Sequence, residues 1–244
     1  MTISVCLATY NGEKFINKQI DSILKQISSD DELIIVDDFS LDNTVQVIRK
    51  LNDSRIKIFI NNQNMGHVYS FGRAIDLAAK DVIFLSDQDD IWMDNRVTFM
   101  IDQILKSNAL LVSTNSKFID AYGNKIDYFI YGVNSKTSNN YLGNIIDIYL
   151  GKKNYFGCTM AFKKELKSII LPIPSYVESH DLWIALAANI NKSNLHCNET
   201  TLERRIHGDN ASIIKRKFTQ QFWSRIVFSI SIVELILRKY FKKN

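Results

Sequence analysis

Residues 82–92 read Val-Ile-Phe-Leu-Ser-Asp-Gln-Asp-Asp-Ile-Trp, an apolar run that ends in three carboxylates. A short run of bulky apolar residues bounded by polar ones is typical of a strand buried on both faces. Asp87, Asp89 and Asp90 would repel one another unless a cation lay between them. Carboxylate oxygens at the end of a rigid strand suit Mg²⁺ or Mn²⁺, which bind carboxylates and phosphates together. Taken alone, the stretch could also be a solvated acidic turn.

Upstream of this stretch, strand patterns alternate with helical ones. We expect strands at 3–8, 33–36, 56–60 and 82–86, and helices at 15–27, 44–51 and 67–79. Such alternation predicts βαβ units on a parallel sheet, in which ligands collect beyond the carboxyl ends of the strands. Polar groups follow three strand ends, at Thr9-Tyr10-Asn11, Asp37-Asp38 and Asp87-Gln88-Asp89. We therefore expect these groups at one edge of the sheet.

Beyond residue 92 the pattern is less regular, and it is weakest between residues 115 and 154. We expect helices at 96–106, 141–150 and 181–189, strands at 110–114 and 155–162, a hairpin turn at 120–124 and extended chain at 195–206. The second half of the chain is therefore the part whose fold the sequence defines least.

The composition is that of a folded domain. Of the 244 residues, 46% are apolar and 11% aromatic, which is enough for a sizeable core. The three cysteines, Cys6, Cys158 and Cys197, are far apart and fit neither a disulfide framework nor a metal motif. Cys6 lies in a strand pattern, so we expect it in the core. No signal peptide is evident, and the cytoplasm is the expected compartment.

Basic residues gather in the C-terminal tail. Residues 215–244 hold eight Lys and Arg and one Glu, whereas the whole chain has a net charge of only +4. Residues 218–241 repeat apolar residues at helical spacing, but the uncharged run 226–233 is shorter than the ~20 residues that span a bilayer. We expect a basic amphipathic helix on anionic lipid, with packing on the domain or in a homodimer as alternatives. This confined distribution does not favour nucleic-acid binding.

Four motifs occur in the order in which family 2 glycosyltransferases carry them. They are Ala8-Thr9-Tyr10-Asn11-Gly12, Val36-Asp37-Asp38-Phe39-Ser40, Asn64-Met65-Gly66 and Ser86-Asp87-Gln88-Asp89-Asp90-Ile91-Trp92. The chain resembles that family over residues 3–210, and the last motif is most similar to bacterial rhamnosyltransferases of O-antigen and capsule assembly. The resemblance implies an α/β chain with the GT-A fold, a mostly parallel nucleotide-sugar-binding sheet flanked by helices.

The resemblance also implies a donor site. It assigns nucleotide-sugar binding to Thr9, Tyr10, Asn11, Asp38, Gly66, Asp87 and Gln88. The Tyr10 ring would pack on the base, unless it is an ordinary turn aromatic. Asp38 would accept a hydrogen bond from the base imide, which favours uracil or thymine, and Asp87 would hold the ribose.

A metal site is implied next to the donor. By the resemblance, Asp89 binds Mg²⁺ or Mn²⁺ with Asp87 and His207 as further ligands, while Arg205 and Asp90 are candidates for the phosphate region. A departing diphosphate needs its charge neutralised, and a divalent ion does this as a Lewis acid. The alternative for His207 is an ordinary loop histidine.

Residues 178–183, Glu-Ser-His-Asp-Leu-Trp, resemble the segment in which the family carries its general base. Asp181 is the expected base, since burial would raise the pKa of its carboxyl toward neutrality. The alternative is an acid favoured by the dipole of a helix N-terminus. His180 stands where many members have an acid, and Arg204 where the family usually has an aromatic residue.

Together these features predict an inverting, metal-dependent glycosyltransferase. It would move rhamnose, or else glucose, galactose or an N-acetylhexosamine, from a dTDP- or UDP-sugar to a lipid-linked glycan at the inner face of the cell membrane. We expect a GT-A domain at 1–214, with a donor half at 1–115 and an acceptor half at 116–214, and the helix at 215–244.

Two other functions are weighed against this one. A sugar-nucleotide-forming nucleotidyltransferase would need a Gly-rich basic loop after the first strand, where residues 9–12 have one Gly and no Arg. A non-catalytic signalling module with a receiver-like Asp37-Asp38 pair would leave the acids at 87–90 without a role.

Overall fold

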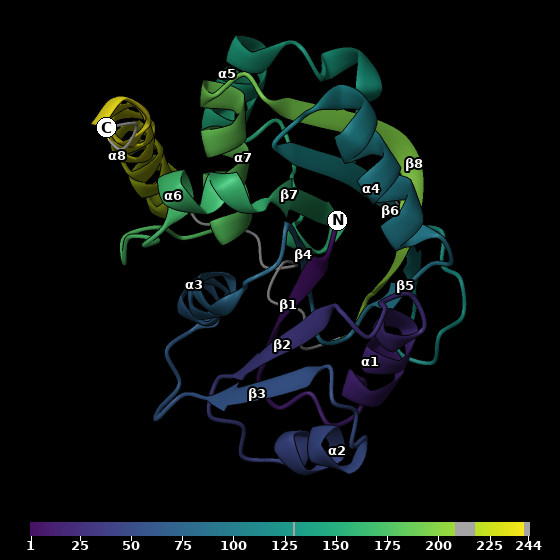
Figure 1. Ribbon diagram of the computed structural model, residues 1–244. Helices are drawn as coiled ribbons and strands as arrows, with labels where there is room; N and C mark the ends of the chain where they lie inside the picture. Colours follow the sequence, from purple (N-terminus) through teal and green to yellow (C-terminus); the bar gives the residue numbers. More distant parts are fainter. Residues whose placement is uncertain (129, 208–217, 242–244) are drawn as a thin grey trace.

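The computed structural model (Figure 1) describes residues 1–128, 130–207 and 218–241. Of the basic residues expected to flank the C-terminal helix, 215–217 and 242–243 lie outside the described residues, whereas Arg238 and Lys239 lie within them. The strands are β1 Ile3–Thr9, β2 Glu32–Asp37, β3 Ile56–Ile60, β4 Val82–Ser86, β5 Ile91–Trp92, β6 Leu111–Ile119, β7 Met160–Lys163 and β8 Asn194–Arg205. The helices are α1 Ile16–Leu24, α2 Thr44–Lys50, α3 His67–Leu77, α4 Arg96–Ser107, α5 Tyr141–Leu150, α6 Lys167–Ile170, α7 His180–Ile190 and α8 Phe218–Phe241.

The strands form one sheet in the order β3-β2-β1-β4-β7-β6-β8-β5. The first four in this order run parallel, with Thr9 of β1 opposite Asp37 of β2 and Leu7 opposite Ser86 of β4. The polar strand ends predicted from the sequence therefore meet at one edge, as expected of right-handed βαβ units.

The other half of the sheet is mixed. Strand β7 is antiparallel to both β4 and β6, β8 runs parallel to β6, and β5 is antiparallel to β8. Strand β5 directly follows the acidic motif and joins its loop to β8. Two expectations are corrected here. Residues 157–159 form a short 3-10 turn before β7, and β6 continues past residue 114 to Ile119, with register shifts around Asn115.

Helices cover both faces of the sheet (Figure 1). Alternate residues of β1 face opposite layers, because side chains alternate along a strand. Val5 and Leu7 join an apolar cluster with residues of α1, α2 and α4. Cys6, fully buried as expected, joins the cluster that includes residues of α3, α5, α7 and α8.

The C-terminal helix α8 spans the residues expected for it and packs against α5, α6 and α7. Within the described residues, none of the helices combines the length and the apolar character needed to cross a membrane. One face of α8 is thus packed against the rest of the domain through α5, α6 and α7.

Glu32 is a buried carboxylate at the start of β2, at the end of the strand away from the acidic edge. Its Oε1 accepts hydrogen bonds from Ser4 Oγ at 2.6 Å and from Ala79 N at 2.9 Å, and its Oε2 accepts one from Lys57 Nζ at 2.6 Å. Burial raises the pKa of Glu32, but these three bonds outweigh burial and hold it below its usual value. The ionised form is therefore built into the fold.

Glu32→Gln should lower the free energy of unfolding at pH 7 by about 1–3 kcal/mol, because an amide nitrogen would then face a buried donor. Since the folded-state pKa lies below 4.5, the carboxylate stabilises the fold above that value. The deficit should shrink as the pH falls through the folded pKa. Urea unfolding at neutral and acidic pH measures both effects, with the exposed Glu165→Gln as the matched control. A deficit of equal size at both pH values would contradict this account.

Candidate active site

Gln88 ties the loop after β1 to the loop after β4. Its Oε1 accepts hydrogen bonds from Thr9 Oγ1 at 2.6 Å and Tyr10 N at 2.8 Å, and its Nε2 donates to Tyr10 O at 3.2 Å. Gly12 lies so close that an added Cβ would stand 2.5 Å from Gln88 Oε1. The Tyr10 side chain is half-exposed. The structure thus brings together Thr9, Tyr10 and Gln88, with Gln88 bracing the loop.

Asn11 connects the loop after β1 to the loop after β2. It adopts a left-handed φ of 49°, which Asn tolerates better than most residues. Its N–H donates to Ser40 Oγ at 2.9 Å, and its Oδ1 accepts from Leu41 N at 2.8 Å. In this structure Asn11 holds the loops after β1 and β2 together. Direct contact of Asn11 with a nucleotide stays a prediction.

Asp38 organises the loop that ends at Gly66. Its Oδ1 accepts hydrogen bonds from Asn61 Nδ2 at 2.7 Å and Met65 N at 2.8 Å, and its Oδ2 accepts one from Gly66 N at 2.8 Å. A carboxylate has about four acceptor positions, so capacity for one more donor is left. Gly66 has a φ of 85° and begins α3. Asp38 and Gly66, both expected in the donor site, are thus direct partners.

Asp89 and His207 meet as expected, although they are far apart in the chain. His207 Nε2 lies 2.7 Å from Asp89 Oδ2. Beside them, Arg205 is buried, and its Nε donates to Asp89 O at 2.8 Å. Its Nη1 donates to the carbonyls of Asp120 and Ala121. Arg205 therefore fixes the loop that carries Asp89, and contact of its guanidinium with a phosphate stays a prediction.

Among the residues that the structure describes, Asp87, Asp90 and Cys158 form a cluster whose possible ligand atoms all lie within 4.8 Å of one another. Asp90 is buried. Its Oδ1 accepts the Arg205 N–H at 3.0 Å, and its Oδ2 has no hydrogen-bond partner among the described residues. Burial, Asp89 and Asp181 together raise the pKa of Asp87 to about 6. Burial and the same kind of repulsion raise the pKa of Asp90 well above its usual value.

This cluster fits a divalent cation. A buried carboxylate oxygen without a partner and carboxyls with raised pKa values are what a missing positive charge produces. Oxygen ligands from Asp87 and Asp90 suit Mg²⁺ or Mn²⁺. Burial raises the pKa of the Cys158 thiol well above its usual value, so Cys158 stays protonated and is the least suited of the three. Asp90, which the resemblance assigns to the phosphate region, lies in this cluster beside Asp87, while Asp89 interacts with both carboxyls and also lies against His207.

Asp181 stands in the first turn of α7. Ser179 caps this helix, because its Oγ accepts the Leu182 N–H. Asp181 Oδ1 lies 2.7 Å from His180 Nε2. Burial raises the pKa of Asp181, but His180, the Gly157 N–H and His67 outweigh burial and hold it below its usual value. The expectation of a raised pKa is therefore wrong: the neighbours of this carboxylate stabilise its ionised form.

His180 connects α7 with α3. Its ring stacks on Phe71 of α3 with centroids 4.1 Å apart, and the His67 ring stands 5.8 Å away, edge-on. His67 interacts electrostatically with both Asp38 and Asp181. The N-terminal ends of α3 and α7 thus bring Asp38 and Asp181 within the electrostatic influence of one histidine, His67.

Sequence reasoning gave no role to Arg204, which is central to the charge balance. Its guanidinium carbon lies 4.0 Å from the centroid of the Phe156 ring. Its charge interacts with the carboxyls of Asp87, Asp90 and Asp181 and lowers the pKa of the first two. The available signal was the departure from the family at this position, where an arginine replaces an aromatic residue.

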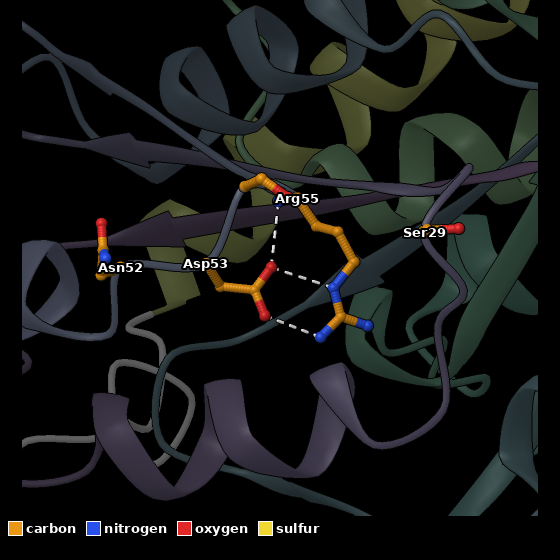
Figure 2. Close-up of a pocket in the computed structure, with 5 residues that line it drawn as sticks. Ser29, Asn52, Asp53 and Arg55 are labelled. Carbon is orange, nitrogen blue, oxygen red and sulfur yellow. Dashed lines mark hydrogen bonds and ion pairs between the residues drawn. The ribbon is translucent and has the colours of Figure 1, made fainter.

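A surface depression lies apart from this edge, next to the start of β3 (Figure 2). Arg55 pairs with Asp53 at 2.7 Å and also donates to the carbonyls of Leu24 and Ile27. This pair lowers the pKa of Asp53 to about 2. The Arg55 guanidinium thus holds the chain before β3 against the C-terminal end of α1. These contacts give the depression a structural role.

Comparison with known proteins decides the family. The family model described as "Glycosyl transferase family 2" matches residues 4–168, more than half of the chain. The chain belongs to this family. It is a glycosyltransferase, which implies a nucleotide-sugar donor and a glycan acceptor. The alternatives of a nucleotidyltransferase and of a non-catalytic module are thereby set aside.

Relatives and a solved structure are similar to this chain over different shares of their length. A UDP-Glc:alpha-D-GlcNAc-diphosphoundecaprenol beta-1,3-glucosyltransferase, WfgD of Escherichia coli, is 28% identical over 91% of this chain and 83% of its own. The dTDP-rhamnosyl transferase RfbG of Shigella flexneri is 35% identical over 45% of this chain and 40% of its own. The crystal structure of S. aureus TarS 1-349 in complex with UDP-GlcNAc matches with a TM-score of 0.73 and 18% identity, over 96% of this chain and 67% of that one. This last match confirms the GT-A fold.

Gly157→Ala should displace the Asp181–His180 pair, because an added Cβ would stand 2.7 Å from Asp181 Oδ1 and 3.0 Å from His180 Nε2. We expect sugar transfer to fall by about 10-fold or more, in line with the cost of misplacing a reacting group. Steady-state kinetics measures this, and thermal unfolding reports on the fold.

The matched control is Gly72→Ala, whose added Cβ would meet Ile173 at 3.6 Å, an ordinary contact. It should keep full activity. Normal activity in Gly157→Ala would show that the position of this pair does not matter for transfer.

Proposed function

We propose that this glycosyltransferase inverts the sugar and moves it from a UDP- or dTDP-sugar to a hydroxyl of a lipid-linked glycan in cell-surface polysaccharide synthesis. The observation that supports it best is that two adjacent residues lie against both acidic groups: Cys158 Sγ is within 4.8 Å of carboxylate oxygens of Asp87 and Asp90, and a Cβ on Gly157 would stand 2.7 Å from Asp181 Oδ1. A diphosphate-binding group and a base must stand this close if one sugar carbon is to lie between them.

The donor would lie across the carboxyl ends of β1, β2 and β4. The Tyr10 ring would pack on the base, and the free acceptor position of Asp38 would take the base imide N–H, as uracil and thymine allow. WfgD, named for UDP-Glc, aligns over most of this chain, whereas RfbG, named for a dTDP-rhamnosyl transfer, aligns over less than half. UDP-glucose is therefore the first donor to test and dTDP-rhamnose the second.

The cation would be held by carboxylates of the acidic motif, Asp87, Asp89 and Asp90. Mg²⁺ or Mn²⁺ bound there would neutralise the charge that develops on the departing diphosphate. Arg204 supplies a fixed positive charge beside the same carboxyls. His207, 2.7 Å from Asp89, holds that carboxylate in place or joins it as a ligand.

Asp181 would act as the general base. Its lowered pKa keeps it ionised near neutrality, so it can accept the proton of the acceptor hydroxyl. The hydroxyl oxygen then attacks the anomeric carbon from the face opposite the diphosphate. The bond between that carbon and the diphosphate oxygen breaks as the new bond forms, which inverts the configuration and releases the nucleoside diphosphate.

The acceptor and the place of action follow the relatives. WfgD is named for an acceptor that carries diphosphoundecaprenol. We propose a polyprenyl-diphosphate-linked glycan as the acceptor here, and the inner face of the cell membrane as the site where this peripheral enzyme works.

Asp181→Asn should reduce turnover about 10²- to 10⁴-fold while donor binding stays near that of the wild type, because only proton abstraction is lost. Nucleoside diphosphate release measures turnover, and donor-induced thermal stabilisation measures binding. The exposed Asp76→Asn in α3 is the matched control. Full turnover in Asp181→Asn would remove the assigned base, and loss of donor binding would point to a structural role.

Removal of divalent ions with a chelator should abolish turnover, and Mn²⁺ or Mg²⁺ should restore it. Asp89→Asn should raise the Mn²⁺ concentration needed for half-maximal turnover at least about 10-fold, since one charged ligand is lost. Asp94→Asn, an exposed acid in the next loop, controls for charge. Unchanged turnover of the chelated enzyme with UDP-glucose and dTDP-rhamnose would contradict metal dependence.

A further inference from the structure

Helix α8 exposes its apolar side chains. Six residues follow one another at spacings of three and four and lie on one face: Trp223, Ile226, Ile230, Val233, Leu237 and Tyr240. Their exposed fractions run from 37% to 67%. We call this set the outer stripe. An exposed apolar face of this length is unusual on a folded domain and marks a contact surface.

Four polar residues of α8 turn the other way, toward the body of the protein. Ser224 Oγ donates to Glu178 Oε2 at 2.7 Å, and Arg225 Nη2 donates to Leu150 O at 2.9 Å. Arg238 donates to the carbonyls of Ile169 and Pro172. Lys239 Nζ donates to Ile190 O at 2.8 Å. No charged residue interrupts the outer stripe, because the described charges of α8 lie beside it or behind it.

Charge decides which partner suits the outer stripe. The sequence has Lys215, Arg216 and Lys217 just before α8 and Lys242 and Lys243 just after it. Two copies that paired along this face, in either direction, would bring basic ends together. An anionic bilayer attracts basic residues at both ends and accepts the apolar stripe between them. Trp223 and Tyr240, near the two ends, are residue types that favour the boundary between lipid and water.

We propose that α8 docks the enzyme flat on an anionic lipid bilayer, with the outer stripe buried among the lipid headgroups and upper acyl chains. The inward contacts keep the helix attached to α5, α6 and α7, so the whole catalytic body is held at the surface. This docking needs no substrate. It rests on the proposed function only for its purpose, which is access to a lipid-linked acceptor.

The test is binding of the full-length protein to vesicles without donor or acceptor. One set contains phosphatidylglycerol and phosphatidylcholine in equal parts, and the other contains phosphatidylcholine alone. The variant Ile230→Glu/Val233→Glu places two charges in the outer stripe. The matched control Leu105→Glu/Leu142→Glu places two on exposed apolar residues of α4 and α5. Co-sedimentation measures partitioning, circular dichroism checks folding, and light scattering measures the oligomeric state.

We expect the wild type and the control to bind the anionic vesicles at least about 10-fold more strongly than the neutral ones, and the stripe variant to lose at least about 10-fold of that binding. Equal binding by the stripe variant and the wild type would overturn the proposal. The proposal would also be overturned if the wild type did not bind vesicles but formed a dimer, and the stripe variant were monomeric. Turnover with a short water-soluble acceptor should be the same in all three proteins, so failure of docking and failure of the catalytic assignment are separable.

Discussion

Repulsion among buried carboxylates is the constraint around which the active site is arranged. Asp87 interacts unfavourably with Asp89 and Asp181, and Asp90 with Asp87 and Asp89. Such a group is stable only if positive charge or protons compensate it. Arg204 supplies part of that charge from β8, and the remaining deficit is what a cation would fill. The acids come from the loop after β4 and from α7, and the arginine comes from β8, so both halves of the sheet are needed to bring these residues together.

The parallel half of the fold and its polar edge could be predicted from the sequence, because buried strands and helices leave clear apolar patterns. The placement of Asp38, Asp87 and Asp89 at one edge of the sheet followed, since they come after β2 and β4, which run parallel on either side of β1. Strand β5 could not be predicted, because two residues are too few to show a period. Cys158 and Arg204 gave no motif, since both reach the site only through long-range pairing of β7 and β8.

The pKa of Asp181 shows where local reasoning stops. Burial alone would raise the pKa of Asp181, and burial was the effect on which the sequence-based expectation rested. In the folded chain, His180 lies 2.7 Å away and Gly157 offers its N–H, and both favour the ionised carboxylate. The direction of the shift is therefore set by His180, the neighbour of Asp181 in α7, together with the N–H of Gly157, which lies in a different element. A base that is already ionised suits an acceptor hydroxyl, which must lose its proton while it attacks.

The contacts of Arg205 affect the order in which parts of the fold can form during synthesis. Arg205 hydrogen-bonds the backbone of Asp89, which precedes it by 116 residues, and also that of Asp120 and Ala121. During synthesis the N-terminal parallel strands emerge first and can begin to fold. The loop that holds Asp89, however, cannot form its hydrogen bond to Arg205 until the ribosome has released β8. A nascent or truncated chain can thus form the parallel half of the sheet while the loop that carries Asp89 still lacks its hydrogen bonds to Arg205.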